Sequence, residues 1–292
     1  MCDITDQKIC KKMPELPEVQ TTIDGLIKEK IIDSNILDTA VDHKNMIFPF
    51  SIEEFRKTII GKSIKKIFRK GKYIFFELED NLHLIIHLRM SGKFVKGDYF
   101  PLEKHEHAAF KFSNGNILKF HDPRKFGKIT LTREVGKTLA RIGIDALDSA
   151  LSYSWLKKRI TTKKKPLKAL LLDQSFISGI GNIYADEILF DSKLHPMMQA
   201  YNLKGEKIKD LYRSIKKILG EAVIHRGTSL GDGLSNFKSF HDLGTHQNYL
   251  AVYGRANEPC IRCGKKIFKQ VVCQRGTYTC PNCQVLPIDH EL

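Results

Sequence analysis

The two residues with the clearest potential for chemistry are neighbours, Pro14 and Glu15, close to the start of the chain. If the preceding Met13 is removed, Pro14 becomes a free N-terminal secondary amine. An α-amino group has a pKa of roughly 8, so part of it is neutral and nucleophilic near neutral pH. Its attack on an aldehyde-level carbon gives an iminium ion, which has no N–H proton to lose and remains an electron sink. In the full chain Met13 acylates Pro14 and blocks this reaction, so we expect the active form to begin at Pro14.

The same stretch also has an ordinary structural interpretation. Prolines and glutamates in the run Pro14-Glu15-Leu16-Pro17-Glu18 are typical of the first turn of a helix. Apolar residues then recur at helical spacing, at Val19, Ile23, Leu26 and Ile27. The local pattern alone does not choose between a helix start and a nucleophilic terminus.

Five of the seven cysteines lie between residues 260 and 283, and four of them form two C-x2-C pairs. This spacing is typical of a tetrahedral zinc site with four thiolate ligands. The fifth, Cys273, is expected to be an unligated residue of a β-hairpin over 265–279, with its tip near Gln274-Arg275-Gly276. The site is too small to fold without metal, so the zinc would be structural. The predicted ligands are Cys260, Cys263, Cys280 and Cys283.

The middle of the chain changes from strand patterns to helix patterns. Period-two alternation predicts strands over 63–69, 73–79, 83–88, 93–96, 108–112, 117–120 and 129–132. Helical spacing predicts helices over 155–160, 167–172, 184–190 and 208–224. We therefore expect a β-sandwich or flattened barrel with the N-terminal helix packed on it, followed by a helical region.

A glycine-containing run, Ser178-Gly179-Ile180-Gly181-Asn182, separates two of the predicted helices. Glycine permits a tight turn there, and N–H groups at the start of the following helix could hold a phosphate. Without other support, a Gly-x-Gly-Asn sequence is only a weak signal for phosphate binding.

The composition favours a polyanionic partner. The net charge is +15 and the isoelectric point is near 9.4, and nucleic acid is the commonest partner of so basic a protein. The sequence has no apolar run near the ~18 residues that span a bilayer, and its first twelve residues are polar, unlike a signal peptide. We expect a cytoplasmic protein that does not bind membranes.

Six segments follow one another in order: MPELPEV (13–19), HLRMSG (87–92), DPRKFG (122–127), ISGIGNIYADE (177–187), VYGR (252–255) and QRGTYTCPNCQ (274–284). Together they resemble one family, the bacterial formamidopyrimidine-DNA glycosylases (Fpg/Nei family). Leu16 favours the branch that acts on oxidised purines, because the endonuclease VIII relatives typically have glycine there.

The resemblance implies an α+β fold in three parts. An N-terminal β-sandwich catalytic domain with a packed N-terminal helix would cover 13–133, and a helix–two-turn–helix DNA-binding domain would cover 134–250. A four-cysteine zinc-finger β-hairpin would cover 251–292, and residues 1–12 would be an extension absent from the active form.

The resemblance also implies a bifunctional glycosylase and abasic-site lyase of base excision repair. Such an enzyme flips an oxidised purine, 8-oxoguanine or a formamidopyrimidine, out of damaged double-stranded DNA. It displaces the base through a Schiff base on the N-terminal proline and cuts the strand on both sides of the sugar by β,δ-elimination. We expect a monomer that works at the bacterial nucleoid.

Four residues would be catalytic by resemblance. Pro14 would attack C1′ of the damaged nucleotide, and Glu15 would be the general acid for opening of the sugar ring, with a pKa raised by burial. Lys72 would assist the lyase step and hold a phosphate. Arg275 would lie against phosphates and serve the second elimination.

Further residues would bind DNA by resemblance. Asn182 would hold a phosphate beside the lesion, and Glu18 and Glu187 would shape the site. Lys163 would contact DNA, although Lys164 and Lys165 are alternatives in the same run. Apolar wedges refill the space left by a flipped base. The expected DNA-contacting and intercalating residues are His105, Arg124, Lys163, Asn182, Met90 and Phe126.

Two departures from the family pattern leave alternatives open. The first is the N-terminal extension. The second is the 229–249 loop, where Phe237, Phe240, His241 and His246 replace an aspartate- and glycine-rich pattern, so that lesion preference is open. The alternatives are an endonuclease VIII-like enzyme for oxidised pyrimidines, and a DNA-binding protein without catalysis whose Pro14 stays blocked.

Overall fold

A computed structural model describes residues 13–229 and 243–286. The expected extension, residues 1–12, lies outside the described residues. So does most of the 229–249 loop, with Phe237, Phe240 and His241.

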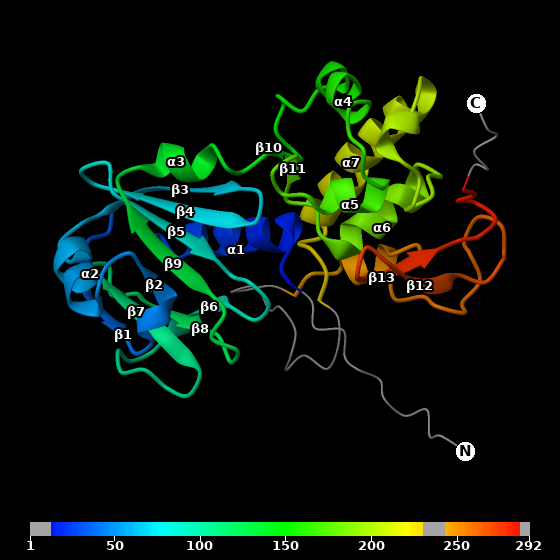
Figure 1. Ribbon diagram of the computed structural model, residues 1–292. Helices are drawn as coiled ribbons and strands as arrows, with labels where there is room; N and C mark the ends of the chain where they lie inside the picture. Colours follow the sequence, from blue (N-terminus) through cyan, green and yellow to red (C-terminus); the bar gives the residue numbers. More distant parts are fainter. Residues whose placement is uncertain (1–12, 230–242, 287–292) are drawn as a thin grey trace.

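The N-terminal half is a β-sandwich (Figure 1). One sheet has the order β2-β9-β5-β4-β3 and the other the order β1-β7-β8-β6. Apolar side chains on the inner faces, such as Phe76, Ile86 and Phe110, are buried between the sheets. The strands are β1 (Ile36–Val41), β2 (Ile47–Phe48), β3 (Ile64–Lys70), β4 (Tyr73–Leu78), β5 (His83–His87), β6 (Lys93–Gly97), β7 (Glu106–Phe112), β8 (Ile117–His121) and β9 (Lys128–Thr132).

All seven strands expected from the sequence are present, with ends within two residues of the expected ones. The sequence did not predict β1, β2 or the helix α2 (Ile52–Ile59). β1 is held at the sheet edge by pairing with β7, and α2 is a short helix that Ser51 caps by accepting a hydrogen bond from the Glu54 N–H. Neither element has a long periodic pattern of its own.

The second half is helical, and a short segment connects it to the sandwich. This segment carries α3 (Val135–Leu139) and β10 (Ile144–Asp145), which pairs in parallel with β11 (Ile177–Ser178). The apolar spacing of the sequence placed the four main helices correctly. They are α4 (Tyr153–Ile160), α5 (Leu167–Leu172), α6 (Asn182–Asp191) and α7 (Glu206–Ile224), and they are accompanied by the 3-10 turns η2 (Ala200–Asn202) and η3 (His246–Tyr249).

Helix α1 (Leu16–Lys28) joins the two halves instead of packing only on the sandwich. Its first residue, Leu16, is fully buried in the helical core. Val19, Ile23 and Leu26 are buried in the sandwich core. The N-terminus of α1 is therefore held at the boundary between the halves, as Figure 1 also shows.

The last part is the antiparallel hairpin of β12 (Phe268–Val272) and β13 (Arg275–Thr279). The expected tip at Gln274-Arg275-Gly276 is wrong by one residue. The turn is Cys273-Gln274, which both have positive φ and fit a two-residue turn with the strand twist. Arg275 is the first residue of β13, and β13 packs on α6.

Among the described residues, none of the helices combines the length and the apolar character needed to cross a membrane.

Candidate active site and nucleic-acid interface

The Glu15 carboxylate sits on the N-terminus of α6. It accepts hydrogen bonds from the backbone N–H groups of Gly181 (2.7 Å), Ile183 (2.9 Å) and Tyr184 (3.4 Å). Any side chain at residue 181 would collide with it, because an added Cβ would lie 2.3 Å from the carboxyl carbon of Glu15. The glycine of this turn therefore makes room for the acid.

The sequence of this turn is a weak signal for phosphate binding, and the structure shows another use for its backbone. The backbone N–H groups of Gly181 and Ile183, which a phosphate could have used, donate hydrogen bonds to the Glu15 carboxylate instead. A helix N-terminus favours negative charge, and here an intramolecular carboxylate supplies it.

Burial gives Glu15 the pKa of a general acid. Loss of hydration raises the pKa from 4.5 to about 7, although the positive charge of Lys72 lowers it. Lys72 is itself only 4% exposed, and burial lowers the pKa of its ammonium. Near neutral pH, part of the Glu15 population is therefore protonated and able to donate a proton.

Glu18, one turn along α1, forms the other side of the site. Its carboxylate accepts hydrogen bonds from the Glu15 N–H (2.9 Å), the Tyr184 hydroxyl (2.7 Å) and the Thr228 N–H (2.7 Å). Burial and the two carboxylates raise the pKa of Tyr184 well above its usual value. Tyr184 therefore remains a hydrogen-bond donor, and Glu18 links the start of α1 to α6 and to Thr228.

Pro14 lies directly before this cluster and is buried. The next peptide is fixed, because the Leu16 N–H donates to the carbonyl of Gly179 (3.0 Å). The nitrogen of Pro14 is thus held one residue from Glu15, at the boundary between the two halves.

Lys72 is brought to the site by the β3–β4 turn. The Gly71 N–H donates to the Asp145 carboxylate (2.7 Å), and Asp145 also pairs with Arg69. The turn is thereby tied to β10. Burial lowers the pKa of Lys72 most. The charges of Glu15 and Glu18 raise this pKa, and the charge of Arg275 in the hairpin lowers it.

Asn182 connects the hairpin to the site. Its amide nitrogen donates to the Gly276 carbonyl (2.9 Å), and its amide oxygen is buried without a partner among the described residues. Arg275, the residue before Gly276, is exposed. The structure therefore brings together Pro14, Glu15, Lys72, Asn182 and Arg275, which are far apart in the sequence.

A buried ion pair that the sequence analysis missed docks the hairpin on the helical half. The Lys168 ammonium contacts Asp186 (2.7 Å), the Thr277 hydroxyl (2.7 Å) and the Gly276 carbonyl (3.2 Å). Asp186 also accepts the Tyr278 N–H (2.9 Å). A lysine within the leucine-rich run 167–172 is the only sequence signal for this pair.

We expect Lys168→Met to lower the free energy of unfolding by about 3–5 kcal/mol, because it leaves a buried carboxylate without its partner. Protonation of Asp186, whose pKa burial raises to about 7, would recover part of this at low pH. Urea unfolding at pH 6 and pH 8 measures both effects. The control is Lys168→Met combined with Asp186→Asn, which should cost less than Lys168→Met at pH 8; an equal cost would contradict the ion-pair explanation.

Met90, Arg124 and Phe126, the expected intercalating set, lie together. The Arg124 guanidinium is 3.3 Å from the sulfur of Met90 and lies over the Phe126 ring at 5.0 Å from its centre. Asp122 shapes their loop by accepting the N–H groups of Arg124 and Gly127. Phe126 is 48% exposed and can therefore reach a partner.

The two other expected DNA contacts lie outside the Glu15 cluster. His105 precedes β7, is half-buried and has a positive φ, and its ring meets His121 edge-on. Lys163 follows α4 and is exposed, with its ammonium over the ring of Phe176. Lys164 and Lys165 are exposed too, so the structure does not single out Lys163 in this run.

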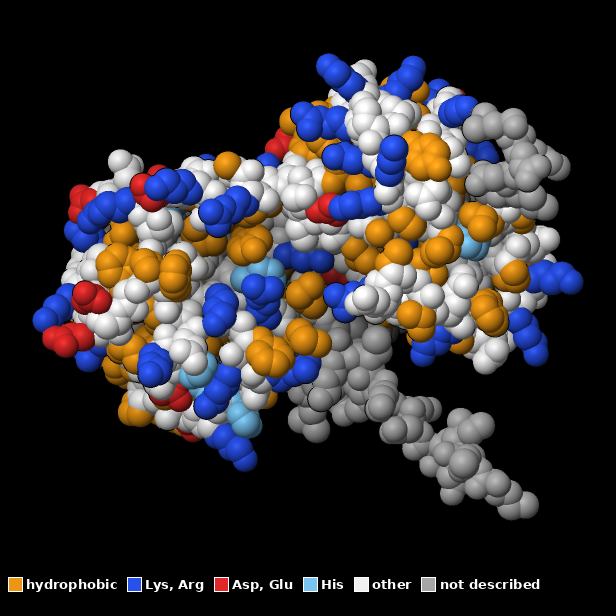
Figure 2. Space-filling view, viewed as in Figure 1, with side chains coloured by type: hydrophobic (Ala, Val, Ile, Leu, Met, Phe, Trp, Pro, Cys, Tyr) orange, Lys and Arg blue, Asp and Glu red, His pale blue; other side chains and the backbone are white. Residues whose placement is uncertain are grey.

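Figure 2 shows lysine and arginine side chains along the depression between the two halves and over the helical half. Carboxylates are sparse along this depression in the same view. A basic surface of this kind attracts the phosphates of a nucleic acid and predicts salt-sensitive binding.

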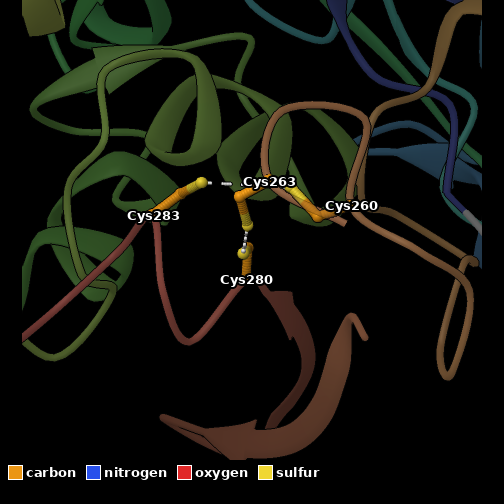
Figure 3. Close-up of side chains that lie close together, drawn as sticks. All are labelled: Cys260, Cys263, Cys280 and Cys283. Carbon is orange, nitrogen blue, oxygen red and sulfur yellow. Dashed lines mark hydrogen bonds between the residues drawn. The ribbon is translucent and has the colours of Figure 1, made fainter. Parts of the chain in front are cut away.

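The four predicted zinc ligands converge on one point (Figure 3). Their sulfur atoms all lie within 4.8 Å of one another, with 3.9 Å between Cys260 and Cys283 and 3.4 Å between Cys263 and Cys280. A tetrahedral zinc with Zn–S bonds of about 2.3 Å would separate its sulfurs by about 3.8 Å. The thiolates therefore fit one structural zinc, and Cys273 lies apart from them in the hairpin turn, as expected.

Removal of the zinc should detach the hairpin and weaken DNA binding by at least about tenfold, because metal-binding energy stabilises such small domains. Chelation followed by fluorescence anisotropy on a fixed duplex tests this, and added Zn²⁺ should restore binding. The control is Cys273→Ser, which should keep both the metal and the affinity. Full affinity in a zinc-free protein would contradict a structural metal.

Family models match three consecutive parts of the chain. They are described as the formamidopyrimidine-DNA glycosylase N-terminal domain (residues 13–129), the formamidopyrimidine-DNA glycosylase H2TH domain (142–232) and a zinc finger found in FPG and IleRS (257–285). The three matched domains surround the buried carboxyl of Glu15 and the basic depression between the two halves. This combination defines a DNA glycosylase of base excision repair.

The chain belongs to the formamidopyrimidine-DNA glycosylase family. It is 39% identical over 274 residues to the formamidopyrimidine-DNA glycosylase of Protochlamydia amoebophila, a match that covers 93% of this chain and 99% of the relative. It is 40% identical over 280 residues to that of Ureaplasma parvum, with 93% and 100% covered.

Solved structures with a similar fold include complexes with DNA. A Lactococcus lactis FPG mutant bound to Fapy-dG-containing DNA superposes with a TM-score of 0.85 at 36% identity, covering 93% of this chain and 100% of that one. The Lactococcus lactis Fpg complex with abasic-site DNA gives a TM-score of 0.82 at 35% identity, with 92% and 99% covered. Both of these similar structures contain DNA.

Proposed function

We propose that the protein excises oxidised purines, 8-oxoguanine and formamidopyrimidines, from duplex DNA and then cleaves the strand by β,δ-elimination. The observation that carries the proposal is the buried Glu15 carboxyl, with a pKa of about 7, next to Pro14. A carboxyl that is protonated near neutral pH is suited to protonate a sugar oxygen while an adjacent amine attacks C1′.

Pro14 would act as the nucleophile once residues 1–13 are absent. Its nitrogen forms a bond to C1′ while the bond to the damaged base breaks, and the amine loses its N–H proton as the departing base takes up a proton. Glu15 donates its proton to the ring oxygen of the deoxyribose, so the sugar opens and the nitrogen becomes a cationic iminium. The family match that begins at residue 13 supports a chain that works from Pro14.

Lys72 and Arg275 would serve the strand cleavage that follows. The iminium acidifies the proton at C2′, and its removal expels the 3′ phosphate; a second elimination expels the 5′ phosphate. Burial lowers the pKa of Lys72, which is the direction that a proton acceptor requires. Asn182 donates to the carbonyl of Gly276, the residue after Arg275, and Asn182 and Arg275 would hold the phosphates next to the sugar.

Excision assays test the proposed substrate. We expect rapid release of 8-oxoguanine opposite cytosine and slow release of an oxidised thymine, each followed by products with phosphates on both sides of the gap. Formamidopyrimidine is part of the proposal because one similar Lactococcus lactis structure holds Fapy-dG-containing DNA. Faster release of the oxidised thymine than of 8-oxoguanine would contradict this proposal and favour the endonuclease VIII-like alternative.

We also infer that the protein acts as a monomer on chromosomal DNA in the bacterial cytoplasm. Each element of the Glu15 cluster comes from a single chain, which supports a monomer. Sedimentation of the protein bound to one lesion duplex would detect a second copy if one were required.

A further inference from the structure

Two histidines meet beside the Glu18 side of the site, and the proposed reaction gives neither of them a role. His225 directly follows α7, and His246 is the first residue of η3. Their Nδ1 atoms lie 3.1 Å apart, so one of these nitrogens carries a proton and donates a hydrogen bond to the other. His246 is buried, with 3% of the residue exposed. This hydrogen bond therefore joins the end of α7 to the start of η3.

Further contacts hold the same two segments together. The Thr245 N–H donates to the carbonyl of His225 (2.9 Å), and the His246 N–H donates to the carbonyl of Gly227 (3.0 Å). The His225 ring also stacks on the Tyr249 ring, with 4.0 Å between their centres and 9° between their planes. The chain that leaves α7 is therefore fixed against η3 through both its backbone and its side chains.

The segment that leaves α7 continues directly into Thr228, which donates to Glu18. Thr228 gives Oε1 of Glu18 both its backbone N–H (2.7 Å) and its hydroxyl (3.1 Å). The Tyr184 hydroxyl donates to the same oxygen (2.7 Å), and the centre of the Tyr184 ring lies 5.8 Å from that of His246. An added Cβ at Gly227 would lie 2.6 Å from this oxygen, so the chain runs close against Glu18 here. His246 therefore lies against both segments that supply these donors to Glu18.

The bond between His225 and His246 persists at neutral pH. Burial and, after it, the charge of His225 lower the pKa of His246 to about 4. The ring of His246 also faces two further titratable side chains, Tyr184 of α6 and Tyr249 of η3. His246 is therefore uncharged near neutral pH, and its Nδ1 can accept a hydrogen bond from His225 or donate one to it. The bond thus does not require one particular protonation state of His225.

We propose that His246 is a positioning residue, which holds the Tyr184 and Thr228 donors on the Glu18 carboxylate. It does so through its bonds to the segment that leaves α7 and through the packing of its ring beside Tyr184. A histidine that departs from the family pattern in the 229–249 loop thereby has a function in this chain.

The donors on Glu18 also affect the proposed acid. Burial raises the pKa of Glu15 most, and the negative charge of Glu18 raises it further, against the positive charge of Lys72. Hydrogen-bond donors favour the charged form of a carboxylate. Two neighbouring carboxylates compete for a proton, so donors that keep Glu18 charged leave the proton to Glu15. This step rests on the proposed function, whereas the positioning of Thr228 and Tyr184 does not.

Amide hydrogen exchange in the DNA-free, zinc-loaded protein tests the positioning. His246→Phe keeps a ring of similar size but removes the bond to His225, so the Thr228 amide should exchange about three- to tenfold faster, as expected for the loss of one hydrogen bond. The Gly71 amide, which donates to Asp145 in another part of the site, should be unchanged. His246→Asn can place an amide group where Nδ1 lies and should restore slow exchange. An unchanged Thr228 rate in His246→Phe, or an equal rise at Gly71, would overturn the proposal.

The pH profile of base release, measured on a chain that begins at Pro14, tests the link to Glu15. In His246→Phe, the alkaline fall in single-turnover release of 8-oxoguanine should move to lower pH by about 0.5–1 unit, because Glu18 then competes better for the proton. The substitution leaves in place the charged and titratable groups that Glu15 faces, which are Lys72 of the β3–β4 turn, Glu18 of α1, Lys168 of α5 and Tyr184 of α6.

The control for the pH profile is His195→Phe. It removes a histidine between α6 and η2 whose Nδ1 accepts the Met197 N–H (3.1 Å), and it should leave the profile unchanged. Faster exchange at Thr228 with an unmoved alkaline fall would overturn the link between His246 and Glu15. If the unsubstituted protein shows no alkaline fall, the proposed role of Glu15 as the acid fails instead, and the exchange result alone decides the positioning.

Discussion

A chain that begins at Pro14 is expected to form a covalent adduct with lesion DNA in the presence of borohydride, whereas a chain that retains residues 1–13 is not. Borohydride reduces an iminium to a stable amine, and only an unacylated Pro14 nitrogen can form that iminium. The excision rate should differ by about 10³-fold or more, since removal of a covalent nucleophile has effects of at least this size. Intact-mass measurement must accompany the assay, so that the N-terminus of each preparation is known.

The control for this comparison is one protein in two states. A chain with a protease site placed before Pro14 is assayed before and after cleavage, so that folding, zinc content and concentration are matched. Activity and trapping should appear together on cleavage. Full-rate excision by the uncleaved chain, with its mass intact, would refute the role of Pro14.

The elements with long local patterns were predictable from the sequence. Strands β4 and β5 are runs of six and five mostly buried residues bounded by turns, and α7 has helical spacing over 19 residues. The C-x2-C pairs identified the zinc ligands, because each pair holds two sulfurs at a spacing set by the local chain. By contrast, β1 and α2 depend on contacts with distant strands and lack such a pattern.

The contacts that give the site its chemistry could not be predicted from local patterns. Glu15 and Gly181 are 166 residues apart, and the carboxylate lies on the α6 N-terminus only because α1 crosses between the halves. The sequence of the glycine turn was also only a weak signal for phosphate binding, because it does not reveal that the N–H groups of Gly181 and Ile183 donate to the distant Glu15. The buried ion pair of Lys168 could not be predicted, because a lysine among leucines is usually exposed. In the fold, Lys168 is buried against Asp186 and the hairpin.

The raised pKa of Glu15 leads to the second large prediction. The proposed acid must be protonated, so its contribution falls as the pH rises through about 7, whereas the Pro14 amine must be neutral, so its contribution rises with pH through its own pKa. Single-turnover release of 8-oxoguanine should therefore follow a bell-shaped pH profile. Glu15→Gln cannot donate the proton, and we expect it to lower the rate by roughly 10²–10⁴-fold and to remove the fall on the alkaline side.

A preformed abasic site distinguishes loss of the acid from loss of the fold. The base is already absent there, so Glu15→Gln should still be trapped by borohydride at a rate within about tenfold of the unsubstituted protein, since Pro14 retains its amine. The glutamine can also keep accepting one of the α6 N–H groups that hold Glu15, which preserves the geometry. If Glu15→Gln lost trapping and base release equally, the carboxyl would act by holding the N-terminus in place and not by proton donation; if it lost neither, Glu15 would have no catalytic role.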